Sequence, residues 1–281
     1  MEFVNCILCN SDDTFNHVES VCDRFKKENN YNILECECGM VMLNPRPTIN
    51  EIEKHYSNKD YQPHYKKNNF ISFLYKTAQI INNKSKISLI EKYFKKSSLL
   101  DFGGGDGQFS SFMINKNWKS YYYEPNLDKK NKNHIYSLLD LNQFTFDVVT
   151  MFHSIEHIHN IDESLEVIYD VLDKDGVLVL SFPNYYAYEK SFFNKDWIAY
   201  DAPRHLYHFS PKTIKKILIK NKFEIIESKP VYLDTFYNII MSTDKLYRFI
   251  FFVPFQIILS LLKIFKNNNL GSSLLLVCKK L

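Results

Sequence analysis

The stretch Leu99-Leu100-Asp101-Phe102-Gly103-Gly104-Gly105-Asp106-Gly107-Gln108-Phe109 holds four of the chain's seven glycines within five positions. A short apolar run from Ser98 to Phe102 leads into it and is typical of a buried strand. A run with helical spacing, from Phe109 to Met113, follows it. Between the two the backbone must turn sharply and allow a close approach, which residues without a Cβ permit at low cost. This order of strand, glycine turn and helix predicts the ligand-binding corner of an open α/β sheet, at the carboxyl ends of its strands.

The glycine spacing excludes several nucleotide-binding patterns. A dinucleotide-binding G-x-G-x-x-G pattern fails because Gln108 stands where its last glycine would be, and no G-K-[ST] follows for a phosphate loop. Asp101-Phe102-Gly103 spells a kinase triplet, but neither a kinase catalytic loop precedes it nor a kinase glycine-rich loop opens the chain. The remaining pattern, D-x-G-x-G-x-G, resembles motif I of the class I S-adenosylmethionine-dependent methyltransferases. Its positions are Asp101, Gly103, Gly105 and Gly107. The alternative is a chance glycine turn in another α/β protein.

The composition limits the classes of protein that the chain can represent. Its 281 residues allow one large domain, or one large domain and a small module. A net charge of +3 without a strongly basic cluster argues against a nucleic-acid-binding protein. No basic-then-apolar signal segment opens the chain, so we expect a cytoplasmic protein. Six cysteines in such a protein favour free thiols or metal ligands over disulfides.

Two cysteine pairs lie near the N-terminus. Cys6 and Cys9 form a C-x2-C pair, and Cys36 and Cys38 form a C-x-C pair. Four thiolates in two pairs can bind zinc tetrahedrally, and a module of ~45 residues needs such a site because its own core is small. The stretch resembles the N-terminal zinc module of methyltransferases of bacterial surface-glycan and sugar-modifying pathways, which ends C-x-x-C-G before an N-P-R-P-like stretch. Here Gly39 and Asn44-Pro45-Arg46-Pro47 match, while the second cysteine pair is one residue shorter. The alternative is a set of reduced structural thiols without metal.

Acidic residues follow the next two predicted strands. A strand from Lys119 ends at Glu124, and Pro125 terminates it. A carboxylate about 20 residues after the glycine loop is placed to accept hydrogen bonds from ribose hydroxyls, so we assign this role to Glu124. A solvated glutamate at a strand end is the alternative. A short strand over 134–138 precedes Asp140, and the methyltransferase resemblance implies that Asp140 meets the adenine amine.

The fourth predicted strand, Phe146 to Phe152, leads directly into His153-Ser154-Ile155-Glu156-His157. H-x-x-E-H is an inverted zinc-protease signature when it lies on a helix, but here it follows a strand, which argues against a protease. It also resembles the methyltransferase loop after strand four, a hydrophobic residue followed by Glu-His that faces the methyl group. That resemblance implies that Phe152 contacts the cofactor, that His157 is a general base, and that His153 is a second candidate.

The acceptor is expected to lie near an aromatic segment, residues 185–210. A turn over 173–176 and a fifth strand over 177–182 precede it. In the resembling family an Arg-His pair just before a Ser-Pro helix start lines the acceptor pocket. Here that start is Ser210-Pro211, with Ser210 as the N-cap. The resemblance therefore implies substrate contacts from Asn184, Arg204 and Tyr207, and makes His205 a rival or partner of His157. A packed structural histidine is the alternative for His205.

Together these patterns predict an α/β fold with a Rossmann-like, seven-stranded, mostly parallel sheet whose last strand is reversed, and a small N-terminal zinc-ribbon-like module. We expect the zinc module at 1–47, a helical linker that covers the cofactor at 48–95, and the methyltransferase domain at 96–281, with an apolar insertion at 236–268. Thr48 and Glu51 form a capping box that opens a short helix. Helical spacing resumes from Phe70 to Phe94, and residues 58–69 are expected to form a loop.

The most apolar segment is 249–265. It contains Pro254, Gln256 and Lys263 and falls short of the ~20 apolar residues that a membrane span needs. A helical pair on the sheet, a dimer face and shallow docking on the inner face of the cell membrane remain open.

The resemblance implies an enzyme that uses S-adenosylmethionine and a structural Zn²⁺. The acceptor would be a small molecule: a sugar, a sugar nucleotide or a precursor of a surface polysaccharide such as a capsule. Transfer would be an in-line displacement in which a histidine removes the acceptor's proton. Methylation of RNA, or of a lipid or quinone, and a non-catalytic cofactor-binding protein are the alternatives.

Overall fold

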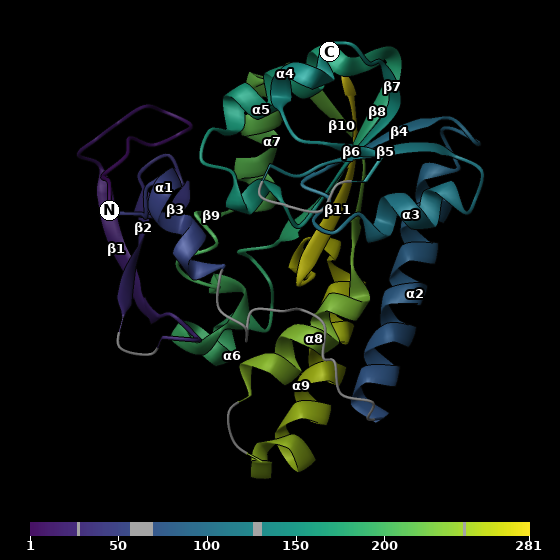
Figure 1. Ribbon diagram of the computed structural model, residues 1–281. Coiled ribbons are helices and arrows are strands. Elements are labelled where there is room, and N and C mark those ends of the chain that lie inside the picture. The colour runs from purple at the N-terminus through teal and green to yellow at the C-terminus, as the bar shows by residue number, and fades with distance from the viewer. Residues whose placement is uncertain (27–28, 57–69, 126–130, 244–245) are drawn as a thin grey trace. The chain divides into compact units, whose positions relative to one another are not determined.

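The computed structural model describes residues 1–26, 29–56, 70–125, 131–243 and 246–281. The expected loop at 58–69 falls on residues 57–69 and so lies outside the described residues. The main sheet has seven strands in the order β6-β5-β4-β7-β8-β11-β10 (Figure 1). Its central pairs are parallel and the last strand is antiparallel, which confirms the predicted fold class. The strands are β4 (Ser98–Phe102), β5 (Lys119–Tyr123), β6 (His134–Ile135), β7 (Phe146–Phe152), β8 (Leu172–Pro183), β10 (Phe223–Pro230) and β11 (Ser273–Lys280).

The central strands are apolar on both faces because helices cover a parallel sheet on both sides. Leu99 and Leu100 of β4, Val148 and Val149 of β7, and the run 177–180 of β8 are fully buried. The helices of this part of the chain are α2 (Phe70–Ile90), α3 (Gln108–Ile114), α4 (Leu138–Leu141), α5 (Ile161–Val171) and α7 (Pro211–Lys220). The continuous apolar runs in the sequence therefore mark strands that are buried on both faces.

Two strand boundaries differ from the prediction. The predicted strand over 134–138 stops at Ile135, because Ser137 accepts a hydrogen bond from the Leu139 backbone N–H and caps α4. The predicted turn over 173–176 belongs instead to β8, which begins at Leu172. There the Asp173 carboxylate accepts the Asp175 backbone N–H at 3.1 Å, beside an irregularity in the pairing with β7. At Ser137 the side-chain cap therefore ends the strand early, whereas residues 173–176 lie in the irregularity between the Leu172 and Val177 pairs with β7.

A second, antiparallel sheet has the strand order β1-β2-β3-β9. Its strands are β1 (Phe15–Cys22), β2 (Asn30–Cys36), β3 (Val41–Leu43) and β9 (Tyr207–His208). The fourth strand comes from the aromatic segment, 164 residues after β3 ends, which the sequence analysis did not predict. The predicted short helix is present as α1 (Ile49–Ile52) and a 3-10 turn, η1 (Glu53–His55). Thr48 donates its backbone N–H to Glu51 Oε2 at 3.0 Å, as the capping box requires.

The apolar segment lies in the second of two helices, α8 (Tyr232–Ser242) and α9 (Leu246–Lys266). Short elements complete this part of the chain: α6 (Lys190–Phe193), η4 (Asn194–Asp196), η5 (Ile198–Tyr200) and η6 (Asn268–Leu270). Among the described residues, none of the helices has the length and apolar character that crossing a membrane requires.

The chain divides into two compact units. The cysteine unit comprises Met1–Lys66, Pro183–Ile217 and Lys229–Leu274, and the sheet unit comprises Lys67–Phe182, Leu218–Ser228 and Leu275–Leu281. The glycine corner belongs to the sheet unit, and the aromatic segment belongs to the cysteine unit. The predicted domain boundaries at 47 and 95 stay a prediction.

Candidate functional site

The glycine corner connects β4 to α3 and needs glycine at several positions for different reasons. Gly103, Gly105 and Gly107 have φ values of +75°, +54° and +76°, a region that residues with a Cβ rarely adopt. A Cβ on Gly103 would lie 2.5 Å from the Cβ of Ser154, and one on Gly107 would lie 2.6 Å from the Tyr122 ring. A Cβ on Gly105 would have no atom within 4 Å. The first and last glycines are therefore needed for packing, while the middle one leaves open space.

Glu124 lies directly beside this open space. It follows β5, and its Oε2 accepts a hydrogen bond from the Gly105 backbone N–H at 3.2 Å. The Gly103 and Gly104 N–H groups donate to the Tyr123 carbonyl at 2.9 and 3.1 Å. These bonds hold the end of β5 against the glycine corner and place the Glu124 carboxylate beside Gly105, and its contact with a ribose stays a prediction.

Asp101 lies in β4, just before the glycine corner, and its side chain is buried. It is 4% exposed, and its Oδ1 accepts a hydrogen bond from the Thr150 hydroxyl of β7 at 2.7 Å. Burial raises the pKa of Asp101 to about 6, although the Thr150 hydrogen bond and the positive charge of Lys86 act in the opposite direction. The carboxyl therefore titrates near pH 6, well above the usual range of an aspartate.

Lys86 is a residue of this site that the sequence analysis missed. It lies on α2, is buried, and interacts electrostatically with Asp101. Its Nζ is 3.9 Å from the ring centroid of Phe152, whose ring also packs edge-on against Phe109 at 4.9 Å. The sequence signal for Lys86 was its position beside Ile87, on the apolar side of the predicted helix. A lysine in such a position often only packs its aliphatic stem against the core, so the position alone does not indicate a function.

The loop after β7 packs against the glycine corner. Ser154 donates its hydroxyl to the Phe102 carbonyl at 3.0 Å, and His153 donates its backbone N–H to the Ser181 carbonyl at 2.9 Å. His153 has φ +52°, and its Nδ1 lies 3.4 Å from Oε1 of the buried Glu156. His157 ends the 3-10 turn η3 (Ile155–His157). The H-x-x-E-H residues therefore form a strand-end loop and not the α-helix of a zinc protease.

Asp140, the predicted adenine contact, lies in the first turn of α4 with its side chain exposed. The structure thus places Asp101, the glycines, Glu124, Phe152 and the 153–157 loop around one corner of the sheet unit, with Asp140 on the helix that follows β6.

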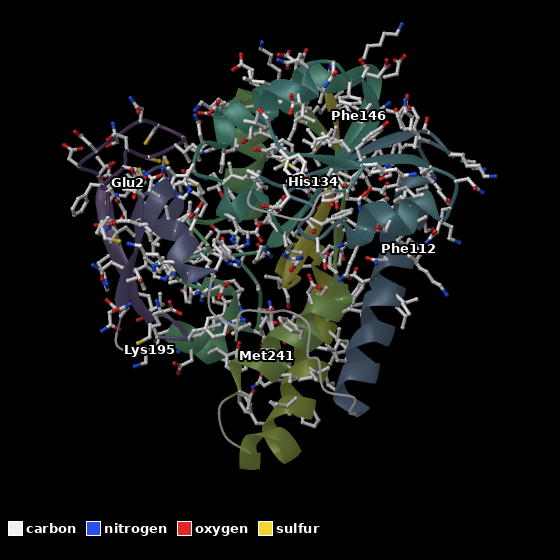
Figure 2. All side chains as sticks on the ribbon, viewed as in Figure 1. Glu2, Phe112, His134, Phe146, Lys195 and Met241 are labelled. Carbon is white, nitrogen blue, oxygen red and sulfur yellow. The ribbon has the colours of Figure 1, made fainter. Side chains whose placement is uncertain are left out.

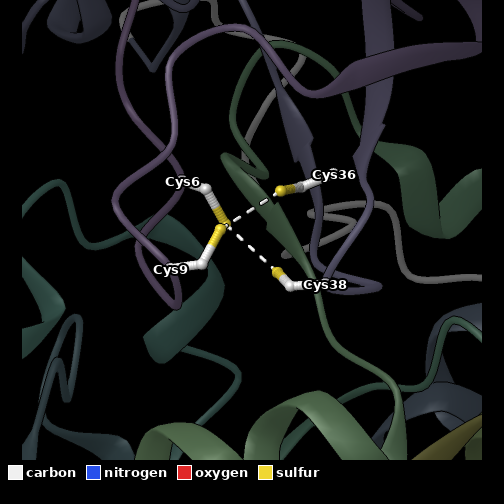
Figure 3. A group of neighbouring side chains, drawn as sticks. All are labelled: Cys6, Cys9, Cys36 and Cys38. Atoms are coloured by element: carbon white, nitrogen blue, oxygen red, sulfur yellow. Dashed lines mark hydrogen bonds between the residues drawn. The ribbon is translucent and has the colours of Figure 1, made fainter.

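The four predicted zinc ligands converge in the cysteine unit (Figure 3). Cys6 and Cys9 precede β1, Cys36 ends β2, and Cys38 lies in the turn before β3. All four sulfurs lie within 4.8 Å of one another, and two of the pairs are 3.4 Å apart. A tight turn makes the short C-x-C spacing sufficient, because Gly39 adopts φ +89° and donates its N–H to the Cys36 carbonyl at 2.7 Å.

The thiols of this cluster are unequal. Burial raises the pKa of Cys6 and of Cys38 above the usual range of a thiol. Burial acts in the same direction on Cys36, but hydrogen bonds that include one from the Thr14 hydroxyl lower the pKa of Cys36 to about 7. Four sulfurs at these separations match a tetrahedral zinc site, in which Zn–S bonds of about 2.3 Å place the sulfurs roughly 3.8 Å apart.

The three predicted substrate residues are all engaged within the cysteine unit. Asn184 is fully buried and donates its Nδ2 to the Asn269 and Gly271 carbonyls, at 2.8 Å each. Tyr207 lies on β9, and its hydroxyl accepts a hydrogen bond from Arg46 Nη1 at 2.7 Å. These bonds tie distant segments of the unit together, so both side chains have a structural role that the sequence analysis did not predict.

Arg204 is the centre of a buried ion-pair network. Its side chain is 1% exposed, and its Nη2 lies 2.8 Å from Asp201 Oδ1 and 3.3 Å from Asp23 Oδ1. The Phe25 ring lies 4.8 Å from its guanidinium carbon. Burial raises the pKa of Asp201, but the nearby His205 and Arg204 outweigh it and hold that pKa at about 2. The predicted Arg-His pair is thus fixed by two aspartates, one of them at the end of β1.

His205 has a defined orientation. Its Nδ1 is 2.8 Å from the Ala199 carbonyl, which accepts only if that nitrogen carries the proton. In the neutral ring this leaves the lone pair on Nε2. The tautomer suits a general base, and the side chain is 12% exposed.

Comparisons with known proteins give one family match and several similar folds. Residues 74–228 match the family model described as a methyltransferase domain. Among solved structures, magnesium protoporphyrin IX methyltransferase from Synechocystis PCC 6803 with bound SAH has a TM-score of 0.50 and 15% identity, covering 82% of this chain and 99% of that one. A SAM dependent methyltransferase from Archaeoglobus fulgidus has a TM-score of 0.49 and 20% identity, covering 72% of this chain and 94% of its own. A search of curated proteins found no match.

Proposed function

Since this chain belongs to the methyltransferase domain family and is a methyltransferase, we propose that it transfers a methyl group from S-adenosylmethionine to a small-molecule acceptor of the sugar type. The acceptor would be a sugar, a sugar nucleotide or a surface-polysaccharide precursor. The observation that carries the proposal is the Gly105–Glu124 hydrogen bond beside the open space over Gly105. A carboxylate next to bare backbone is suited to a ribose, whose hydroxyl groups donate to it. The Synechocystis methyltransferase, whose fold is similar, binds SAH.

We assign cofactor binding to residues around this corner. Glu124 would hold the ribose hydroxyls, and the backbone of Gly103, Gly105 and Gly107 would lie against the methionine and ribose parts. Asp101 and Lys86 would bind the charged methionine end, because one carboxyl and one ammonium lie together there. The ring of Phe152 would pack on the cofactor, and Asp140 would accept from the adenine amine.

Bound S-adenosylmethionine supplies an activated methyl electrophile, so the chain's own residues mainly align the acceptor and exclude water. We assign proton removal from the acceptor to His157, on the loop packed against the glycine corner, with His205 as rival or partner. His153 is the second candidate on the same loop, where Oε1 of Glu156 lies 3.4 Å from its Nδ1. Removing the proton as the methyl group transfers avoids a cationic product oxygen.

We further propose that Cys6, Cys9, Cys36 and Cys38 bind a structural Zn²⁺. The sulfur separations support four-thiolate ligation, which leaves no open position for catalysis. The sugar-type acceptor rests on the likeness of this cysteine module and its N-P-R-P stretch to those of sugar-modifying methyltransferases.

Calorimetry with S-adenosylmethionine and S-adenosylhomocysteine tests the cofactor site. Glu124→Gln keeps the size of the side chain but removes its charge, so we expect affinity to fall by roughly 10- to 150-fold, since a hydrogen bond to a charged group contributes about 1.5–3 kcal/mol. Glu166→Gln, at an exposed position of α5, is the matched control and should bind like the parent. Absence of heat with the parent protein and either compound would refute the proposal.

Substitution of the histidines tests the proposed chemistry. With radiolabelled S-adenosylmethionine and a panel of sugar nucleotides, we expect His157→Ala to lower turnover by roughly 10²–10⁴-fold while cofactor affinity stays the same. His17→Ala, at an exposed position of β1, is the control. If the double variant of His157 and His205 keeps turnover within a few-fold of the parent, histidine-assisted deprotonation is wrong.

A further inference from the structure

The outward face of α9 is apolar and its inward face is partly polar, the reverse of an ordinary surface helix. Phe255, Ile258, Leu262 and Phe265 are 60%, 60%, 57% and 83% exposed. Their spacing of three or four residues places them along one side of the helix. Gln256 and Ser260 are buried on the other side.

The same reversal occurs on α8. Its buried positions include Thr235, Asn238 and Ser242, while its exposed positions are Tyr232, Phe236, Tyr237, Ile240 and Met241, the last labelled in Figure 2. The buried polar groups have partners within the cysteine unit. Ser272 donates to the Thr235 hydroxyl at 2.9 Å, Asn238 donates to Glu189 at 3.4 Å, and Ser242 accepts the Ile198 N–H at 2.9 Å.

In water, a helix gains stability by burying its apolar side and exposing its polar side. Both helices bury polar side chains and expose large apolar ones, while Ile239 of α8 and Val253 and Ile264 of α9 are buried apolar residues of the inward side. The inward polar groups of α8 are hydrogen-bonded. An outer surface with exposed apolar side chains is favoured when it contacts an apolar environment. An amphipathic helix with such an outward apolar stripe fits an arrangement in which it lies in the plane of the membrane interface.

The charges point to the kind of surface. The sequence of α9 has no acidic residue and three basic ones, Arg248, Lys263 and Lys266. Lys263 and Lys266 are exposed in its last turn, beside Leu262 and Phe265. Among the described residues of α8 and α9, Asp234 is the one acid. A basic helix with an outward apolar stripe complements anionic lipid, whereas a second copy would bring only further positive charge.

We propose that α9 docks on an anionic phospholipid surface through Phe255, Ile258, Leu262 and Phe265, with Lys263 and Lys266 at the lipid phosphates. The apolar side chains enter the headgroup–acyl boundary, and the lysines supply the preference for charge. This docking is independent of the proposed acceptor and of the histidine chemistry.

Vesicle flotation tests the proposal with the full chain. We expect binding to vesicles of phosphatidylcholine and phosphatidylglycerol at roughly 7:3, weaker binding to phosphatidylcholine alone, and release at high salt. Serine at Phe255, Ile258, Leu262 and Phe265 together should weaken binding tenfold or more, because the apolar side chains that enter the headgroup–acyl boundary are lost. Lys263→Glu with Lys266→Glu should remove the preference for anionic lipid.

A matched control replaces Leu139 and Ile219, which are exposed on α4 and α7, with serine and should float like the parent. Thermal unfolding shows whether each variant is folded, because the replaced side chains are exposed and should not contribute to the core. The proposal is overturned if the parent does not float with anionic vesicles, or if the four serines leave flotation unchanged. It is equally overturned if light scattering shows that the serines convert a dimer into a monomer while vesicle binding is absent. Calorimetry with S-adenosylmethionine separates this result from any failure of the proposed function.

Discussion

Asp101 is a buried carboxyl whose charged form is disfavoured by its surroundings. It is buried at the carboxyl end of β4, and its pKa is raised to about 6 by that burial, with only partial opposition from Thr150 and Lys86. Side chains that cost stability and lie at a ligand-binding corner are typical of functional positions. The raised pKa therefore adds to the case that Asp101 contacts the cofactor.

We predict that Asp101→Asn stabilises the folded protein above pH 6 and weakens cofactor binding. In the unfolded chain this carboxyl has a pKa of about 3.9, so between roughly pH 4 and 6 the native state binds more protons and stability falls as pH rises. Asparagine does not titrate, so its advantage grows over that window and is constant above it, on the order of 3 kcal/mol. Urea unfolding at pH 5 and pH 8 measures this difference, and a variant less stable than the parent at pH 8 would contradict it.

At the scale of single elements, side-chain caps decide where several helices begin. Ser210 and Thr213 bond reciprocally at the start of α7. Thr213 donates its N–H to the Ser210 hydroxyl at 3.2 Å, and Ser210 donates its N–H to the Thr213 hydroxyl at 2.9 Å. Such local signals can be read from the sequence, and both this helix start and the Thr48 capping box were predicted correctly. Where a cap competed with a strand pattern, as at Ser137, the cap prevailed over the predicted end of β6.

We predict that Ser210→Ala lowers the free energy of unfolding by about 1 kcal/mol, because the Thr213 N–H loses its partner in a buried place. Ser111→Ala, at an exposed position inside α3, is the matched control and should be neutral or slightly stabilising, since alanine favours helices. Chemical denaturation of both variants gives the comparison. Equal stability of the two would show that the cap contributes nothing.

At the scale of the whole molecule, the cysteine unit is assembled from three separate stretches of chain. The N-terminal sheet takes its last strand from Tyr207–His208, and Arg204 joins Asp23 of the first stretch to Asp201 of the second. The four cysteines lie in the first of these stretches. A metal there would therefore stabilise the conformation on which the rest of the unit is built.

We predict that the native protein contains one equivalent of zinc and that Cys38→Ser loses it. Four-thiolate binding is coupled to folding, so this variant should also unfold at a lower temperature than the parent. Cys22→Ser, a thiol outside the cluster, should keep both the metal and the stability. Mass spectrometry of the native proteins and thermal unfolding measure the two effects, and a metal-free parent of full stability would exclude a structural zinc.

The order of buried strands, the glycine corner, the meeting of two cysteine pairs and several helix starts could be predicted from the amino-acid sequence. Each of these depends on neighbours in the chain: a backbone that needs φ above zero, an apolar period, or a cap three residues away. Only the tertiary structure decided that Lys86 faces Asp101, that Asn184, Arg204 and Tyr207 are engaged in structural contacts, and that α8 and α9 turn their apolar sides outward. These features depend on contacts between residues that are far apart in the sequence. Burial and electrostatic energy arise from such contacts, so a single residue type does not reveal them.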